Sequence, residues 1–204
     1  MKKTLLVALF ATSLLLFNCE NENADFKITK DSIGKINKNT KVSELESIFA
    51  IDSIVAENGV PNLNLGLNIK IEPQTDSTST GIQAGFIYDK IELFEKGGNQ
   101  LLSLTPTKDS VPTIENIRIY DPRYKTDKGL TINSTFKDIS EKYTIKKIIT
   151  SMNNVVILIK DSGLYFTIDK KELPESLRYD ASLNIEAVQI PDAAKIKYMM
   201  LAWE

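Results

Sequence analysis

The residue types that carry most enzyme chemistry are scarce in this chain. It has no histidine, and its one cysteine is Cys19. The lack of histidine excludes a histidine general base, the Ser-His-Asp and Cys-His nucleophile pairs, and every zinc site with a histidine ligand. A single cysteine excludes an internal disulfide, a cysteine-only zinc site and an iron–sulfur cluster. Catalysis would therefore need paired carboxylates, a Ser–Lys pair or a metal held by carboxylates.

The carboxylates and turn serines lack the spacing that these chemistries need. Glu44 and Glu46 are two residues apart on a predicted helix, so they do not face each other. The segment Asp161 to Gly163 lacks the G-x-S-x-G frame of a nucleophile turn and predicts a hairpin loop instead. Segment 76–81 has one carboxylate, whereas the calcium-binding loop of an EF-hand needs several. The two glycine-rich phosphate-binding motifs, G-x-x-x-x-G-K-[ST] and G-x-G-x-x-G, do not occur. The sequence therefore predicts no catalytic residue, no metal site and no cofactor, and it indicates a protein that is not an enzyme.

The first 18 residues differ sharply from the rest of the chain. Lys2 and Lys3 precede an apolar run from Leu5 to Phe17. That run is too short to cross a hydrocarbon core of roughly 30 Å, but it fits the hydrophobic part of a secretory signal. The chain then turns abruptly polar at residues 19–24, unlike a buried helix. Residues 1–18 are therefore predicted to be a signal peptide.

The signal ends in Leu16-Phe17-Asn18-Cys19, and no small-x-small cleavage site precedes Asp25. This ending resembles the lipobox of bacterial lipoproteins, in which the cysteine thiol receives diacylglycerol and becomes the new N-terminus. Asn18 stands where that family usually has Gly, Ala or Ser. The resemblance implies lipidation of Cys19, a polar tether over residues 19–25, and an anchor in the cell envelope at the outer membrane. The alternative is a simple secreted protein whose thiol has no role.

The charge pattern limits the possible partners. The chain has 25 Lys and Arg against 27 Asp and Glu, and no stretch is strongly basic, which argues against nucleic acid as a partner. Without a polybasic segment, acyl chains alone would hold the protein on a membrane. Lysine greatly outnumbers arginine, and Asn and Ile are abundant. This composition, together with the lipobox-like ending, resembles lipoproteins of the Bacteroidota.

Two segments of the body are similar at an offset of 94 residues. Each has a Ser or Thr that can cap a helix, followed by apolar residues at i, i+3 and i+7. This spacing predicts a helix of about ten residues with one apolar stripe. A glycine ahead of each helix, Gly34 or Gly129, suits a turn with positive φ. The matched pairs are Thr40 and Ser134, Val42 and Phe136, Leu45 and Ile139, Phe49 and Tyr143, and Ile51 and Ile145.

Extended runs follow each predicted helix. Residues 114–120 are expected to open the second half as residues 26–29 open the first. The pattern predicts an α+β fold made of two pseudo-repeats, residues 26–112 and 113–204, each a short capped helix packed on an antiparallel sheet. Strands are predicted at residues 67–72, 85–94 and 101–105, around a Ser/Thr-rich loop at 74–81, and at 155–159, 164–168, 183–190 and 195–203.

In pattern, this plan resembles the tandem repeats of the β-lactamase inhibitor protein. A single unit resembles small outer-membrane assembly lipoproteins of similar layout. The shared mark is a glycine followed five or six residues later by Ser or Thr at a helix start. The alternative is one continuous α+β sheet in which the helix repeat is a coincidence.

One turn combines residues that are typical of binding surfaces. Residues 120–124 hold two tyrosines and one of three arginines, and Tyr and Arg are enriched at interface hot spots. Tyr120, Arg123 and Tyr124 are therefore predicted to contact a partner. Alternatively, the segment is a linker whose tyrosines close the sheet ends.

These patterns together predict a lipid-anchored cell-envelope protein that acts as a non-catalytic binding or scaffolding module, with a membrane contact and an envelope protein as partners. The alternative is a carboxylate-dependent hydrolase of an envelope polymer, which needs two acidic groups in one cleft.

Overall fold

The computed structural model describes residues 24–57, 60–61, 79–80, 82, 86–180 and 183–203. The predicted signal peptide, Cys19 and most of the predicted tether lie outside the described residues. The strand predicted at 67–72 and most of the loop predicted at 74–81 also lie outside them.

Most of the regular structure is strand, in three sheets, with few helices, so the predicted α+β class is confirmed. The largest sheet has nine strands in the order β12-β13-β14-β15-β10-β9-β8-β4-β6. Its strands are β4 (Ser53–Glu57), β6 (Ser79–Thr80), β8 (Lys90–Phe94), β9 (Gln100–Pro106), β10 (Ile114–Ile119), β12 (Ile145–Thr150), β13 (Asn154–Ile159), β14 (Leu164–Asp169) and β15 (Ile196–Ala202).

Two smaller sheets complete the strand structure. A four-stranded sheet has the order β11-β1-β2-β3, and a two-stranded sheet pairs β5 with β7. Their strands are β1 (Lys27–Ile28), β2 (Ser32–Ile33), β3 (Ile36–Asn37), β11 (Lys125–Thr126), β5 (Val60–Pro61) and β7 (Phe86–Ile87). The described α-helices are α1 (Leu45–Ile48), which follows a 3-10 turn at Val42–Glu44, and α2 (Phe136–Lys142).

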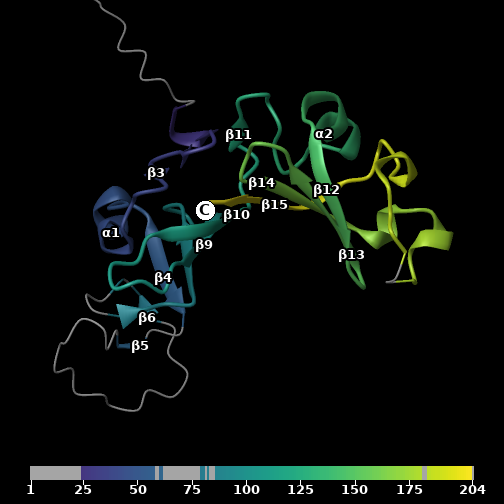
Figure 1. Cartoon of the computed structure of the whole chain (residues 1–204). Coiled ribbons are helices and arrows are strands. Elements are labelled where there is room, and N and C mark those ends of the chain that lie inside the picture. The colour runs from purple at the N-terminus through teal and green to yellow at the C-terminus, as the bar shows by residue number, and fades with distance from the viewer. Residues whose placement is uncertain are drawn as a thin grey trace, which may run out of the picture.

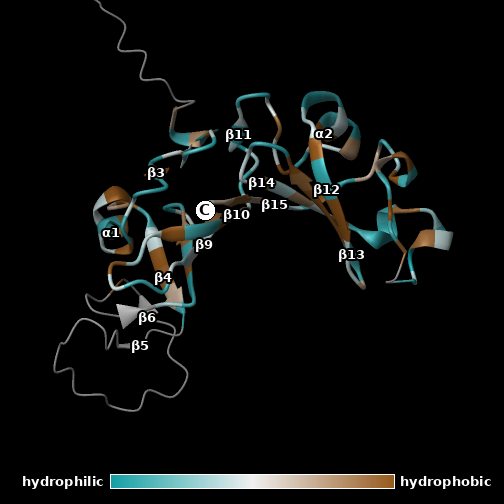
Figure 2. Cartoon of the chain, viewed as in Figure 1, coloured by the Kyte–Doolittle hydropathy of each residue, from teal (hydrophilic) through white to brown (hydrophobic). Residues whose placement is uncertain are grey.

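The nine-stranded sheet bends into an arch with α1 and α2 on its outer side (Figure 1). Several of its strands, such as β4, β8 and β13, alternate between buried residues and more exposed ones, because successive side chains point to opposite faces. In β13, for example, Val155 and Ile157 are buried while Val156 and Leu158 are half-exposed. Hydrophobic residues accordingly colour β12 and β13, whereas the outer turns of α2 are hydrophilic (Figure 2). One face of the sheet therefore carries the core, and we call the other the open face.

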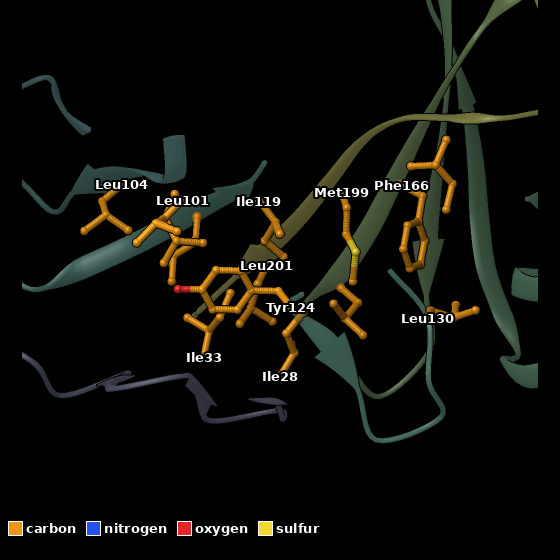
Figure 3. Packing of buried hydrophobic residues seen from close by; sticks show 14 of the residues in the cluster. Ile28, Ile33, Leu101, Leu104, Ile119, Tyr124, Leu130, Phe166, Met199 and Leu201 are labelled. Atoms are coloured by element: carbon orange, nitrogen blue, oxygen red, sulfur yellow. The ribbon is translucent and has the colours of Figure 1, made fainter. Parts of the chain in front are cut away.

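The core lies between the sheet and the elements that cover it. Ile28 and Ile33 of the four-stranded sheet are 1% and 0% exposed, and Phe136 of α2 is 3% exposed. Figure 3 shows Ile28 and Ile33 beside Leu201 of β15. The short helices and the four-stranded sheet therefore cover one face of the nine-stranded sheet.

The helices begin one residue later than predicted. Thr40 and Ser134 are not the N-caps; these are Lys41 before the 3-10 turn and Thr135 before α2. The hydroxyls of Thr40 and Ser134 instead accept hydrogen bonds from the backbone N–H three residues earlier, at 3.0 and 3.1 Å. Each hydroxyl thus closes the turn that precedes its helix.

Acidic side chains hold both helix starts. The N–H of Lys41 donates to Glu44 Oε2 at 3.0 Å, and the N–H of Thr135 donates to Asp138 Oδ2 at 2.8 Å. These are the reciprocal contacts of a capping box, in which the third helical residue reaches back to the cap. The helices are shorter than the predicted ten residues, with seven in α2 and four in α1.

The strand predictions are partly right. β9, β13, β14 and β15 confirm four predicted strands, and the strand predicted at 85–94 is divided into β7 and β8. Segment 183–190 is not a described strand and contains a 3-10 turn at Ala187–Gln189, so that prediction is wrong. The expectation that residues 114–120 mirror residues 26–29 is also wrong. β1 lies in the four-stranded sheet, whereas β10 lies at the centre of the nine-stranded sheet between β9 and β15.

Candidate functional site

Tyr124 is a core residue. Only 2% of it is exposed, and its ring meets the Phe26 ring edge-on with 5.0 Å between centroids. Figure 3 shows the ring among Ile33, Ile119 and Leu201. Burial raises the pKa of its phenol. The prediction that Tyr124 contacts a partner is therefore wrong, because almost all of its side chain is buried in the core.

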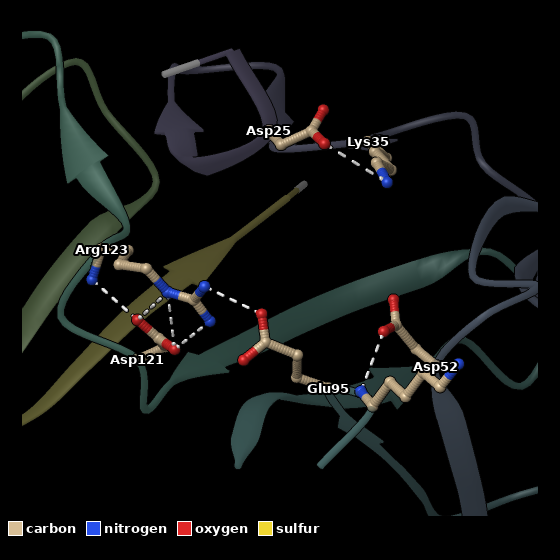
Figure 4. A network of polar contacts seen from close by, with 7 residues as sticks. Asp25, Lys35, Asp52, Glu95, Asp121 and Arg123 are labelled. Carbon is tan, nitrogen blue, oxygen red and sulfur yellow. Dashed lines mark hydrogen bonds and ion pairs between the residues drawn. The ribbon is translucent and has the colours of Figure 1, made fainter. Parts of the chain in front are cut away.

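Arg123 organises a polar network beside the core. Its Nε donates to both Asp121 carboxylate oxygens, at 3.0 and 3.1 Å, and its Nη2 lies 2.7 Å from Asp121 Oδ2. Nη1 lies 2.8 Å from Glu95 Oε1. Figure 4 shows Arg123 joined to both carboxylates, and the guanidinium carbon also lies 4.3 Å from the centroid of the Phe26 ring. Arg123 thus ties the turn after β10 to the turn after β8, so its donors already serve the fold.

The two carboxylates of this network are held in their ionised form. Burial raises the pKa of Asp121, but hydrogen bonds and charge from Arg123 outweigh burial and leave that pKa below its ordinary value. The hydrogen bond from Arg123 also lowers the pKa of Glu95. A general acid needs a pKa near the working pH. Asp121 and Glu95 are therefore unsuited to the proton donation that the hydrolase alternative requires.

The network borders a hollow of about 350 Å³ that Arg123 and Tyr124 help to line. Asp25 and Lys35 form an ion pair across 3.3 Å at its edge. The Asp52 carboxylate accepts from the N–H of Lys96 at 3.3 Å (Figure 4). Charged groups at this hollow are thus largely paired with one another, which favours a structural role.

We expect the Asp121 carboxylate to stabilise the fold in a pH-dependent way. Asp121→Asn should lower the free energy of unfolding by about 1–3 kcal/mol at pH 7, since hydrogen bonds to charged groups contribute in this range. A carboxyl with a lowered native pKa stabilises the fold above its unfolded pKa and loses this contribution as the pH falls through its native pKa. The difference between variant and wild type, measured by urea unfolding, should therefore shrink in acid.

Glu141→Gln provides the control for this prediction. Glu141 pairs with Lys137 across 3.7 Å on the exposed side of α2. Exposed pairs contribute roughly 0–1 kcal/mol, so this variant should stay near the wild type. Equal losses in both variants, or a loss for Asp121→Asn that persists in acid, would contradict a stabilising charge at Asp121.

Tyr120 lies apart from Arg123 and Tyr124, on the open face. The Arg118 guanidinium carbon lies 4.8 Å from the centroid of the Tyr120 ring and 3.7 Å from that of Tyr198. All three side chains are half-exposed. Among the described residues no acid forms an ion pair with Arg118. We call this group the Arg118 cluster; sequence reasoning found Tyr120 but missed Arg118 and Tyr198.

A second hollow, of about 950 Å³, adjoins the Arg118 cluster at one end of the strands. Asn116, two residues before Arg118 on the same strand face, lines it and donates from Nδ2 to Tyr165 Oη at 2.6 Å. Trp203 also lines it, and its indole N–H donates to the carbonyl of Lys30 at 3.0 Å. The site therefore combines aromatic side chains with amide and hydroxyl groups.

Lysines surround this second hollow. Lys30, Lys146 and Lys160 line it, and each is exposed. Asp31 and Asp161 also line it, but Asp31 already pairs with Lys38 across 2.9 Å. The local charge is therefore positive, in contrast to the slightly acidic whole chain.

Two further features concern the described residues as a whole. In the ranges that the structure describes, no three His, Cys, Asp or Glu side chains gather closely enough to hold a metal ion. Over the same ranges, no helix has the length and apolar character needed to cross a bilayer.

The comparisons with known proteins concern the fold alone. No protein-family model matches the chain, and no curated protein matches it. The fold is similar to that in the crystal structure of the uncharacterized protein yfeY from Escherichia coli, with a TM-score of 0.51 and 13% sequence identity. The similarity covers 87% of this chain and 99% of that chain.

Proposed function

We propose that the chain is a lipid-anchored protein of the cell envelope, held by acyl chains on Cys19 at the outer membrane. The support is the lipobox-like ending of an N-terminal apolar run. The body begins close behind it, since Ala24–Phe26 forms a 3-10 turn and β1 starts at Lys27. Two or more acyl chains suffice for stable anchoring without a basic segment.

We further propose that the body is a non-catalytic binding or scaffolding module. The observation that carries this proposal is the Arg118 cluster, in which two tyrosine rings contact an arginine that no described acid pairs with. Large side chains that keep a polar group exposed are typical of interface hot spots. Tyr120 remains a candidate partner contact as a member of this cluster. The hydrolase alternative would need a pair of carboxylates, but Asp121 and Glu95 already accept hydrogen bonds from Arg123.

We also propose that the body consists of two related halves that meet at the middle of the large sheet. The strand order supports this, because residues 26–112 supply the consecutive strands β9-β8-β4-β6 and residues 113–204 the consecutive strands β12-β13-β14-β15-β10, so the two halves meet at the β9–β10 pair. The capping contacts of Lys41 and Thr135 also match at the offset of 94 residues. A common origin of the two halves would explain why each helix is preceded by a turn closed by a hydroxyl and then begins with a capping box.

Cys19→Ala tests the anchor. The variant should lose the acyl mass and move from the membrane fraction to the soluble fraction, because no other site would carry the lipid. Intact mass spectrometry and fractionation of cells that express the full chain measure both effects. Asn18→Gly is the matched control, since it restores a small residue before the cysteine and should be lipidated at least as fully as the wild type. An unchanged mass and membrane fraction for Cys19→Ala would refute the anchor.

A further inference from the structure

We propose that the Arg118 cluster docks an acidic segment of a protein partner, with a partner carboxylate bound by the Arg118 guanidinium. This inference rests on the binding function proposed above and names the chemistry of its partner. It starts from the position of Arg118 at the middle of the open face. Arg118 pairs with Met200 of β15 on one side and with Ser103 of β9 on the other.

The first argument is the geometry of the guanidinium. Tyr198 and Tyr120 lie at 3.7 and 4.8 Å from its carbon, so aromatic rings restrain the group before any ligand binds. These contacts hold the guanidinium beside the rings, and its N–H groups can still donate hydrogen bonds to a ligand. A planar fork of N–H donors matches a carboxylate in bidentate geometry. Restraint also reduces the entropy that is lost on binding.

The second argument is that two lysines near Arg118 on the open face already have acidic partners, whereas Arg118 has none among the described residues. Lys197 Nζ lies 2.8 Å from Asp169 Oδ2, and Lys90 pairs with Glu92. Arg118 has no such partner among the described residues and is half-exposed. A partly desolvated cation without a counter-charge gains more from an incoming anion than an already paired one does. The open face therefore has one central point that favours an anion.

The third argument is the surface around this point. The half-exposed side chains of Leu158, Tyr165 and Met200 continue the row of cross-strand neighbours from Arg118 toward β13. Beyond Asn116 lies the larger hollow with its exposed lysines Lys30, Lys146 and Lys160. A ligand in which carboxylates alternate with apolar side chains would match both the row of half-exposed side chains and the hollow lined by lysines. An acidic polypeptide has this mixed chemistry along its length.

The shape of the sheet favours a protein segment over a bilayer. Arg118 lies on a central strand, on the face opposite the buried Ile117 and Ile119. The helices lie outside the arch, so this face is its inner side (Figure 1). A flat membrane would meet the ends of the arch before its centre. A peptide is narrow enough to follow the inner face.

The test measures, by fluorescence anisotropy, how tightly a short fluorescent peptide of alternating Glu and Val binds to the full-length mature protein. The same peptide with Gln in place of Glu, and vesicles of phosphatidylcholine with phosphatidylglycerol, are the comparison ligands. The Glu peptide should bind more tightly than the Gln peptide and than the vesicles. Its affinity should fall with salt, because the contact is between charges.

Variants locate the contact. Arg118→Gln should weaken Glu-peptide binding by about tenfold or more, as expected for loss of a charge-assisted pair. Arg118→Lys should recover only part of the affinity, since lysine keeps the charge but lacks the planar fork. Lys137→Gln makes the same charge change on α2, outside the arch, and should change affinity by less than about twofold.

Three results would overturn the inference. They are equal binding of the Glu and Gln peptides, equal losses in Arg118→Gln and Lys137→Gln, and vesicle binding that depends on Arg118 and exceeds peptide binding. Circular dichroism and thermal melting establish that each variant is folded. The membrane fraction of full-length Arg118→Gln is measured in parallel. A retained anchor with unaltered peptide binding would overturn the docking site alone, whereas a failed Cys19→Ala test would overturn the anchor alone.

Discussion

Phe166→Ala should destabilise the body by about 3–5 kcal/mol, as large-to-small changes at well-packed aromatic positions do. Phe166 lies in β14 and is 0% exposed. Its neighbours across the sheet are Ile157 of β13 and Met199 of β15, both also 0% exposed. The lost ring would leave a cavity among β13, β14 and β15, where the surrounding strands have little freedom to close it. Urea unfolding followed by circular dichroism measures the loss.

Val188→Ala is the control for this effect. Val188 is 90% exposed and lies in the 3-10 turn at Ala187–Gln189. Surface changes away from special features usually stay within about 0.5 kcal/mol of the wild type. A loss for Phe166→Ala no larger than that for Val188→Ala would mean that β14 does not pack as described.

Gly34→Ala should be the second strongly destabilising change, by about 2–5 kcal/mol. Gly34 has φ +53°, as predicted for the turn before the first helix, and an added Cβ would lie 2.3 Å from the carbonyl oxygen of Asp25. The left-handed conformation costs roughly 1–2 kcal/mol for a residue with a side chain, and overpacking adds about 1–3 kcal/mol. The clash is with backbone, so no rotation of a side chain relieves it.

Gly129→Ala separates the two causes. Gly129 lies in the turn ahead of α2 with φ +76°, but an added Cβ would meet nothing within 4 Å. This variant should therefore show only the conformational cost of roughly 1–2 kcal/mol. If the two variants lose the same free energy of unfolding, the close approach of Asp25 to Gly34 does not contribute.

Local patterns predicted the parts of the fold that depend on neighbouring residues. β13 and β14 were expected from two apolar runs around the turn at residues 160–163, and they form a hairpin. The positive φ of Gly34 and Gly129 was expected because a turn precedes each helix. The caps were misplaced by one residue, because the hydroxyls of Thr40 and Ser134 bond to the preceding turn instead.

Long-range pairing decided what became of the predicted contact residues. Tyr120, Arg123 and Tyr124 are close in sequence, yet the chain turns at Asp121 and sends them into three environments. Tyr124 enters the core because β1 and β2 cover it, and Arg123 is held by Asp121 and Glu95. The hydrophobic periodicity of the sequence does not show which of these three residues are buried, because burial here depends on which distant segments cover the turn.

The sequence by itself determined which chemistries are closed to this protein and led to the proposed lipid site at Cys19, because residue types and an N-terminal apolar run can be recognised without the fold. It also determined the α+β class through periodicity and turn residues. Only the tertiary structure brought Arg118 into contact with both Tyr120 and Tyr198, since β10 and β15 are distant in sequence and meet through backbone hydrogen bonds at the middle of the sheet. The proposed anchor thus rests on a local pattern of the chain, whereas the candidate binding face exists only after β10 and β15 pair.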